Sequence, residues 1–129
     1  MIEQTIDLKI INEFLKNFNI KIEEISVFQK FLIYKKNNEN IGFLDYSLIY
    51  DRLEINYIFV NENYRECNIA SLLVDYMIEK SECKSISLEV NENNAKAINF
   101  YKKNKFLEFA RRKNYYNNAD ALLMIRELV

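Results

Sequence analysis

The stretch from Glu54 to Phe106 restricts the possible folds of this chain more than any other part of the sequence. Its apolar runs predict a strand from Glu54 to Val60 and a second strand from Ser85 to Val90. Its helical spacings predict helices from Asn68 to Glu79 and from Asn94 to Asn104. A polar connection from Tyr64 to Ala70 joins the first strand to the first helix. Two strands joined by a helix of this length form a parallel crossover, and such units place ligands at the carboxyl ends of their strands. We therefore expect the functional site near Val60 to Ala70 and near Glu89.

Residues on the amino-terminal side of this unit predict antiparallel strands. β-Branched and aromatic residues favour strands from Phe31 to Tyr34 and from Ile41 to Ile49, with a turn from Asn37 to Asn40 between them. Asp51 and Arg52 then form a tight connection into the first strand of the crossover. Three antiparallel strands should therefore lead into the parallel unit.

The two ends of the chain complete the predicted fold. Apolar residues recur at helical spacing from Thr5 to Phe18, with Thr5 as a candidate N-cap, and an irregular or short helical link follows from Ile20 to Val27. After the second helix of the crossover unit, a closing hairpin is predicted. Its strands run from Phe106 to Arg112 and from Ala121 to Arg126, and Lys113 to Asp120 connect them. The order of elements indicates one α/β domain over residues 1–129, with a mixed sheet of about six strands and helices on both faces.

The overall charge gives no general attraction to nucleic acid or to an anionic membrane. Lys and Arg total 18 against 19 for Asp and Glu, and the three charges of Arg111 to Lys113 are few for a nucleic-acid patch. No apolar run reaches the ~20 residues that span a bilayer, and Met1 to Asn12 lacks the basic start and apolar core of a signal peptide. We expect a cytoplasmic monomer or homodimer with no membrane or nucleic-acid partner.

The absence of His and the presence of only two Cys limit the chemistry of the chain. Cys67 and Cys83 have no neighbouring Cys or His, so we expect no metal site, and free thiols are favoured over a disulfide. Without His, acid–base chemistry must use Glu, Asp, Tyr, Cys, Lys or water. The chain also has one Gly and no Pro, so we expect Asn at turns that need a positive φ.

The polar connection joins the first crossover strand to its helix through the residues Arg65-Glu66-Cys67-Asn68-Ile69-Ala70. Unpaired backbone N–H groups and the helix dipole favour an anion such as a pyrophosphate at a helix N-terminus. Taken alone, the pattern is explained equally well by Asn68 as the N-cap of the helix.

This connection resembles the acyl-CoA loop of the GNAT N-acetyltransferase superfamily, in which Arg or Gln, two residues, Gly, one residue, and Gly or Ala follow in order. Arg65 and Ala70 fit that pattern, and Asn68 stands where the family has Gly. The chain is also similar to the RimI-type branch, which acetylates ribosomal-protein N-termini, at Leu88-Glu89-Val90, Asn94, Ala97, Tyr101, Arg111-Arg112-Lys113-Asn114-Tyr115-Tyr116, Asp120-Ala121 and Met124. The resemblance covers roughly residues 54–126. It implies a GNAT-like sheet whose fourth and fifth strands, those of the crossover, run parallel and splay apart at their carboxyl ends.

The resemblance implies acetyl-CoA as co-substrate. The implied contacts are the backbone of Ile58, Phe59 and Val60 along the acetyl-pantetheine arm, the loop amides of Arg65, Glu66, Cys67, Asn68, Ile69 and Ala70 at the pyrophosphate, and Asn94, Ala97 and Tyr101 beside the pantetheine. Glu89 matches the family's general base, and Tyr101 matches the acid that protonates the leaving thiolate.

The reaction itself requires these residue types. Acyl transfer from a thioester to an amine needs the ammonium deprotonated and the departing sulfur protonated, which a carboxylate at a strand end and a phenol on the facing helix can supply. The alternatives are that Glu89 is a solvated charge at a strand end, and that Tyr101 packs in the core beside Ala97 and Ile98.

Three residues depart from the family pattern. Asn68 brings a side chain to the point where a phosphate approaches most closely, and Glu66 places a negative charge beside it, so both are expected to weaken coenzyme binding. Lys105 replaces the Gly that usually precedes Phe106. We expect Asn104 or Lys105 to adopt the left-handed backbone conformation, which costs a non-Gly residue about 1 kcal/mol of folding stability.

Three functions remain open from the sequence. The leading hypothesis is an acetyl-CoA-dependent N-acetyltransferase acting on a peptide or protein N-terminus, such as that of a ribosomal protein. The second keeps the chemistry and takes a small amine or antibiotic as acceptor. The third is a degenerate, non-catalytic domain that binds acyl-CoA or a protein partner.

Overall fold

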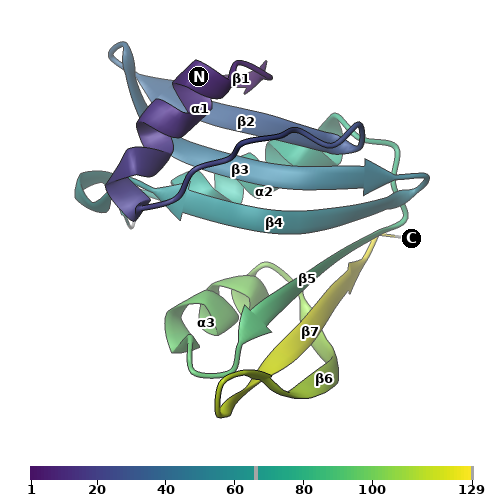
Figure 1. The fold of residues 1–129 in the computed structure, drawn as a ribbon. Helices are drawn as coiled ribbons and strands as arrows, with labels where there is room; N and C mark the ends of the chain where they lie inside the picture. The colour runs from purple at the N-terminus through teal and green to yellow at the C-terminus, as the bar shows by residue number, and fades with distance from the viewer. Residues whose placement is uncertain (66, 129) are drawn as a thin grey trace.

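The computed structural model describes residues 1–65 and 67–128. Within them, seven strands form one sheet in the order β1-β2-β3-β4-β5-β7-β6 (Figure 1). The elements are β1 (Ile2–Thr5), α1 (Leu8–Leu15), η1 (Lys16–Phe18), β2 (Gln29–Lys36), β3 (Glu39–Ile49), β4 (Arg52–Val60), η2 (Glu62–Tyr64), α2 (Ile69–Glu79), β5 (Ser85–Asn91), α3 (Ala95–Lys103), β6 (Leu107–Tyr116) and β7 (Ala119–Glu127). No helix among the described residues is both long and apolar enough to cross a membrane.

The sheet is mixed, because β4 and β5 run parallel and the other neighbouring strands run antiparallel. The parallel pair is short, and its register is Arg52 with Ser85, Leu53 with Ile86 and Glu54 with Ser87. Beyond these pairs the two strands diverge toward their carboxyl ends (Figure 1). The predicted parallel crossover with splayed strands is confirmed.

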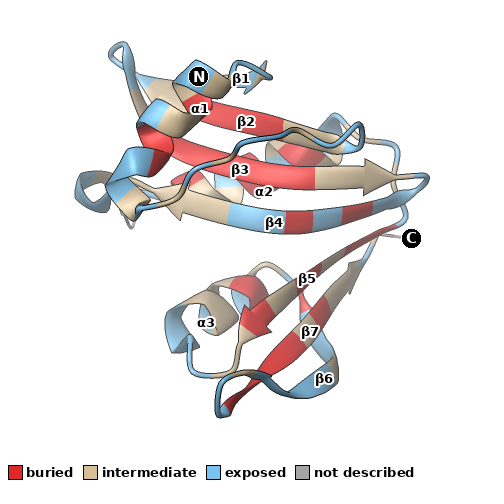
Figure 2. Cartoon of the chain, in the orientation of Figure 1, coloured by how far each residue is buried: buried red, intermediate tan, exposed pale blue. Residues whose placement is uncertain are grey.

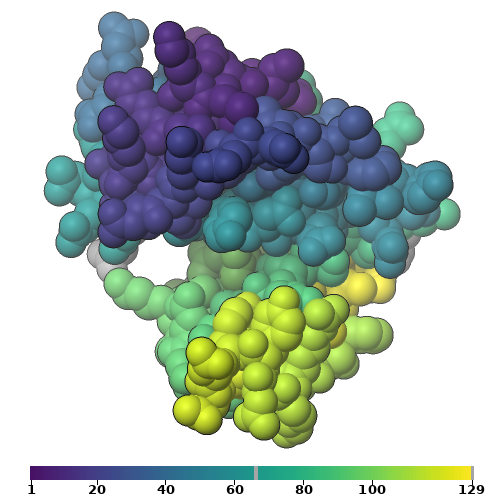
Figure 3. Space-filling view, viewed as in Figure 1, coloured from purple at the N-terminus to yellow at the C-terminus, as the bar shows by residue number. Residues whose placement is uncertain are grey.

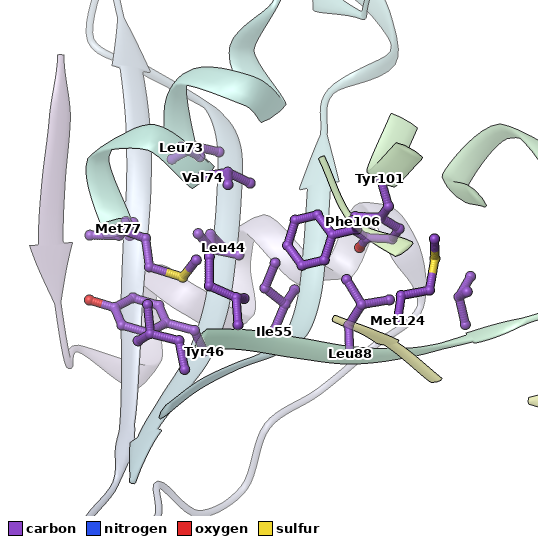
Figure 4. Close-up of a cluster of buried hydrophobic side chains, with 14 of the residues drawn as sticks. Leu44, Tyr46, Ile55, Leu73, Val74, Met77, Leu88, Tyr101, Phe106 and Met124 are labelled. Carbon is purple, nitrogen blue, oxygen red and sulfur yellow. The ribbon is translucent and has the colours of Figure 1, made fainter. Parts of the chain in front are cut away.

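Helices cover both faces of the sheet, as predicted. On one face, α1 packs on β2 and β3 in a cluster of Ile11, Phe14, Leu15, Phe31, Ile33 and Phe43. The opposite face carries the larger core, in which α2 covers β3, and the ring of Tyr101 from α3 lies with Phe106 near Leu88 and Met124 (Figure 4). Burial is greatest along the central strands, whereas β6 is largely exposed (Figure 2).

The sheet has seven strands rather than the expected six or so, because β1 was not predicted. This strand lies at one edge of the sheet, is four residues long and contains two polar residues, Glu3 and Gln4, so it gives no apolar alternation. The assignment of Thr5 as N-cap was wrong, since Thr5 ends β1. Asp7 is the N-cap of α1, and its carboxylate accepts from the N–H of Lys9 at 2.9 Å.

The closing hairpin is longer than predicted. β6 continues to Tyr116, and Asn117 and Asn118 form a two-residue turn into β7, where a connection from Lys113 to Asp120 was expected. The exposed edge strand β6 has the polar composition of a loop because neither of its faces is deeply buried.

Asn residues take the left-handed conformation that Gly usually supplies. In the described part of the chain, six of the eight non-Gly residues with positive φ are Asn, namely Asn19, Asn37, Asn38, Asn68, Asn114 and Asn118. Lys105 is also left-handed, with φ of 72°, as expected from its place before Phe106.

Gly42 serves a different purpose, which is close packing. A Cβ added to it would lie 2.9 Å from the Cγ2 methyl of Ile69, in the first turn of α2. The missing side chain therefore lets the N-terminus of α2 approach β3 closely.

Candidate functional site

The divergence of β4 from β5 leaves one edge of β4 without a strand partner. Ile58, Phe59 and Val60 pair with β3 on their other side and have no partner in β5, whose pairing stops at Glu54. Backbone groups on such an edge are free to pair with an extended ligand. The space-filling view shows an opening between the part built from β1 to β4 and the part built from α3 and β5 to β7 (Figure 3).

A cleft of about 830 Å³ lies where β4 ends and α2 begins, and we call it the cationic cleft. It is lined by Val60, Tyr64, Arg65, Asn68, Ile69, Ala70, Ser71, Lys96, Asn99, Phe100, Lys103 and Asn104. Three of these residues are cations, one from the loop and two from α3. Lys96 and Lys103 were missed by the sequence analysis, although their seven-residue spacing places them on one face of the helix.

The predicted phosphate loop forms part of this cleft. Asn68 occupies the N-cap position of α2 in the left-handed conformation, with φ of 63°, and its side chain makes no capping hydrogen bond. The capping alternative is therefore wrong for the side chain, and Asn68 instead adopts a backbone conformation that Gly adopts readily. Arg65 Nε donates to the carbonyl of Val60 at 3.4 Å. Cys67 is exposed and is not among the lining residues, and Glu66 lies outside the described residues.

A second cleft, of about 940 Å³, lies between the splayed strands, and we call it the acidic cleft. It is lined by Gln29, Asp45, Ser47, Glu54, Ile55, Asn56, Tyr57, Ile58, Phe59, Glu89, Val90, Asn91, Asn94, Ala97, Tyr101, Tyr115 and Tyr116. Three carboxylates are present in this set, and no Lys or Arg is found among the described residues that line it. The structure thus brings the predicted residues Ile58, Phe59, Glu89, Asn94, Ala97 and Tyr101 together in one cleft.

Glu89 lies in the carboxyl-terminal half of β5, with its side chain 27% exposed. Its carboxylate forms an ion pair with Arg112 of β6, at 3.2 Å from Oε1 to Nη2. Burial first, and then the charge of Glu89, raise the pKa of the Tyr116 phenol. Glu89 is therefore an ion-paired carboxylate in the lining of the acidic cleft, and not a free solvated charge at a strand end.

Tyr101 combines the two roles that the sequence left open. Its ring is 7% exposed and packs edge to face against Phe100 and Phe106, so it belongs to the core. The same residue lines the acidic cleft, and its hydroxyl makes no hydrogen bond to another described residue. Burial raises the pKa of Tyr101 to about 12. The phenol therefore stays protonated across the physiological range.

Asn94 and Ala97 are held by the start of α3. Asn94 is the N-cap, and its Oδ1 accepts from the N–H of Ala97 at 3.2 Å. This capping bond occupies the side-chain oxygen of Asn94, so a ligand would meet its remaining groups.

The basic residues of β6 are neutralised within the protein. Arg111 pairs with Glu108, Glu92 and Asp120, Arg112 pairs with Glu89, and Lys113 pairs with Asp120. Among the described residues, no group of three or more His, Cys, Asp or Glu could hold a metal ion.

Asp120→Asn should make the free energy of unfolding less dependent on pH in the acidic range. The Asn114 N–H, 3.0 Å from Oδ1, and the nearby Lys113 and Arg111 lower the pKa of the Asp120 carboxyl. Its stabilising contribution is therefore fully present above the unfolded value near 4, and is lost as the pH falls through the lower folded pKa. Urea unfolding from about pH 7 to pH 2 should show a difference between wild type and variant that shrinks toward low pH. The control is Asp75→Asn, an exposed carboxylate on α2, and an equal difference at every pH would contradict the prediction.

Comparison with known proteins identifies one matching family and several similar solved structures. Residues 8–106 match the model of the acetyltransferase (GNAT) family. Similar solved structures include the ribosomal-protein-S18-alanine N-acetyltransferase of Escherichia coli, with 20% identity, a TM-score of 0.84, and coverage of 99% of this chain and 94% of that chain. Ard1 of Thermoplasma volcanium has 30% identity, a TM-score of 0.69, and coverage of 77% and 70%. A GNAT family acetyltransferase of Elizabethkingia anophelis with acetyl-CoA bound has 20% identity, a TM-score of 0.76, and coverage of 99% and 97%. No protein of curated function matches the sequence.

Proposed function

Because the chain belongs to the acetyltransferase (GNAT) family, we propose that it transfers an acetyl group from acetyl-CoA to the α-amine of a protein N-terminus. The observation that carries this proposal is the pair of oppositely charged clefts along one splayed strand. A cation-lined cleft attracts an anionic coenzyme, and an acidic cleft attracts an ammonium group. The two reactants would meet at the free edge of β4.

The residues of the cationic cleft fit acetyl-CoA. Arg65, Lys96 and Lys103 supply positive charge near the N-terminus of α2, whose unpaired N–H groups favour a phosphate. The free edge of β4 offers backbone groups to an amide-containing arm. When bound, acetyl-CoA would supply the acetyl group as an activated thioester. The side chain of Asn68 remains where the family has Gly, so we expect weaker binding than with Gly.

Glu89 and Tyr101 fit the two proton transfers of the reaction. Glu89 would accept the proton of the acceptor ammonium, so that its nitrogen can form the new amide bond. As the carbon–sulfur bond breaks, Tyr101 would stabilise and protonate the departing sulfur, and the nitrogen loses its second proton to solvent, from which the phenol regains a proton. Both residues line the acidic cleft, Glu89 from β5 and Tyr101 from α3.

An α-amine is easier for Glu89 to deprotonate than a lysine amine. Reference pKa values are about 8 for an α-amine and about 10.4 for a lysine amine, so a lysine costs about 3.4 kcal/mol more to deprotonate. The E. coli neighbour is named for an alanine of ribosomal protein S18, and we propose a ribosomal protein N-terminus in the cytoplasm as the physiological acceptor. The exposed Tyr115 beside the acidic cleft would contact the peptide.

A small polyamine is the second candidate acceptor. The carboxylates of Glu54 and Glu89 in the acidic cleft favour it, because two carboxylates would bind a ligand with more than one positive charge. A turnover screen with acetyl-CoA decides between the two, using N-terminal peptides, including one that carries the N-terminal sequence of ribosomal protein S18, beside polyamines and aminoglycosides. Preference for peptides supports the proposal. Turnover of small amines alone would transfer the assignment to them, and binding of acetyl-CoA without any turnover would indicate a non-catalytic domain.

Replacing both Lys96 and Lys103 with Gln should weaken acetyl-CoA binding. Both lysines are exposed, and an exposed charge contributes up to about 1 kcal/mol, which is up to about fivefold in Kd for each residue and up to about 30-fold for both. Calorimetry should show the loss shrinking as salt is added, because salt screens exposed charges. Lys102→Gln is the matched control, since Lys102 is exposed on the same helix and does not line the cleft. Asn68→Gly should act in the opposite direction and tighten binding. An unchanged affinity in the double variant would remove these lysines from the coenzyme site.

A further inference from the structure

Asp45 is a buried carboxylate on β3 that the proposed chemistry does not use. The residue is 1% exposed, and its polar partners in the described structure are side-chain amides. Gln29 Nε2 donates to both carboxylate oxygens, at 3.0 and 2.9 Å. Asn56 Nδ2 donates to Oδ1 at 3.0 Å. Asp45 therefore ties a residue of β2 to a residue of β4 through the strand between them.

Asn56 is the extra residue of a β-bulge. Opposite it, Asp45 pairs with Tyr57 and the next residue, Tyr46, pairs with Ile55, so Asn56 has no partner in the β3–β4 ladder. A bulge bends its strand and increases the local twist. Besides Asp45, the Asn56 amide also donates to Ser47 Oγ at 3.1 Å. The side chain of the bulged residue is thus held on the β3 side by two hydrogen bonds.

The position of the bulge coincides with the point at which the site opens. The last β4–β5 pair is Glu54 with Ser87, two residues before Asn56. The residues after the bulge, Tyr57, Ile58 and Phe59, line the acidic cleft. A bend fixed at Asn56 therefore sets the direction in which these residues leave β5.

We propose that Asp45 is a positioning residue, which holds the β4 bulge through Asn56 and so fixes the separation of β4 and β5 across which acetyl transfer takes place. The proposal rests on the function proposed above. In it, Asp45 touches neither reactant and acts through the backbone of β4. A misplacement of about 1 Å in such a site can cost about 100-fold in rate.

The competing role for Asp45 is recognition of a cation in the acidic cleft. The hydrogen bonds argue against this, because both carboxylate oxygens already accept from amides. The two roles predict different kinetics. Loss of a cation contact raises KM for the acceptor, whereas loss of positioning lowers kcat.

Asp45→Asn tests the proposal with almost no change in volume. The new NH₂ group would face either the Gln29 or the Asn56 amide, donor against donor, and the bulge would lose part of its support. We expect kcat to fall by about 100-fold, with acceptor KM and acetyl-CoA affinity changed by less than about threefold. Asp75→Asn, the same change at an exposed helix position, should leave all three parameters as in wild type.

The double variant Gln29→Glu with Asp45→Asn provides the rescue. The Asn at position 45 can then donate to the Glu at position 29 and still accept from Asn56, and the Glu keeps the hydrogen bond that Gln29 accepts from the Ser26 N–H at 3.1 Å. The bonding pattern returns while the charge moves to β2. We expect kcat to recover to within about fivefold of wild type.

Amide hydrogen exchange gives a readout that does not depend on turnover. Asp45→Asn should accelerate exchange in the peptide that covers β4, leave the peptide that covers α2 unchanged, and return to the wild-type pattern in the double variant. An unaltered kcat and β4 exchange in Asp45→Asn, a higher acceptor KM at constant kcat, or failure of the double variant to rescue would each overturn the positioning role. If the wild type proved inactive, the proposed function would fail, and exchange in β4 would still decide whether Asp45 holds the bulge.

Discussion

Glu89→Gln is expected to lower kcat/KM by about 10² to 10⁴-fold at neutral pH, the range that a general base typically contributes. Gln has nearly the shape of Glu and cannot accept the proton of the acceptor ammonium. With a reference pKa near 8, about a tenth of an α-amine is already neutral at pH 7, and most of it is neutral at about pH 9. The loss should therefore shrink as the pH rises, because the amine then deprotonates without help.

Because Glu89 forms an ion pair with Arg112, the effect of Glu89→Gln needs a control variant that breaks a similar ion pair. Removing the carboxylate also releases an Arg side chain at the cleft, which could disturb binding. Glu108→Gln breaks a comparable ion pair, that of Glu108 with Arg111, on the same hairpin and outside the lining of either cleft. If both variants lose activity equally at every pH, the hairpin's structure is responsible. A fall confined to Glu89→Gln, with recovery at high pH, identifies the base.

The parallel crossover could be predicted from the sequence because its signals are local. Each of its strands and helices carries its own periodicity, and Asn68 and Asn94 mark the N-terminal boundaries of α2 and α3. β1 escaped prediction because a four-residue edge strand has no such pattern. The length of β6 was underestimated for a related reason, since an exposed edge strand shows no apolar alternation.

The candidate site was only partly predictable, because much of it depends on which elements become neighbours in space. Glu89 and Tyr101 could be proposed as site residues from the family resemblance of motifs along the chain, and both line the acidic cleft. The lysines on α3 become part of the cationic cleft only when that helix lies opposite the N-terminus of α2. Asp45 lies eleven residues before Asn56, and only the register of β3 and β4 reveals that they meet at a bulge.

Tyr101→Phe is expected to lower the rate of acetyl transfer by about 100-fold, the lower end of the range for a general acid, and to leave acetyl-CoA affinity nearly unchanged. Phe keeps the ring that packs against Phe100 and Phe106, and the hydroxyl has no hydrogen-bond partner among the described residues that would be left unpaired. The variant therefore removes the proton donor with little effect on the fold. Single-turnover measurement of transfer separates this loss from changes in product release.

The raised pKa of Tyr101 also predicts how the rate of acetyl transfer depends on pH. A phenol with a pKa of about 12 holds its proton more tightly than a thiol of ordinary pKa near 8.5. Tyr101 can therefore protonate the thiolate only where burial makes the sulfur similarly basic, and otherwise stabilises it through a hydrogen bond. In either case the phenol stays neutral until about pH 12, so Tyr101 should cause no decline of the wild-type rate up to about pH 10. A decline below that pH that disappears in Tyr101→Phe would show that the phenol ionises earlier, and an unchanged transfer rate in Tyr101→Phe would leave this residue with its packing role alone.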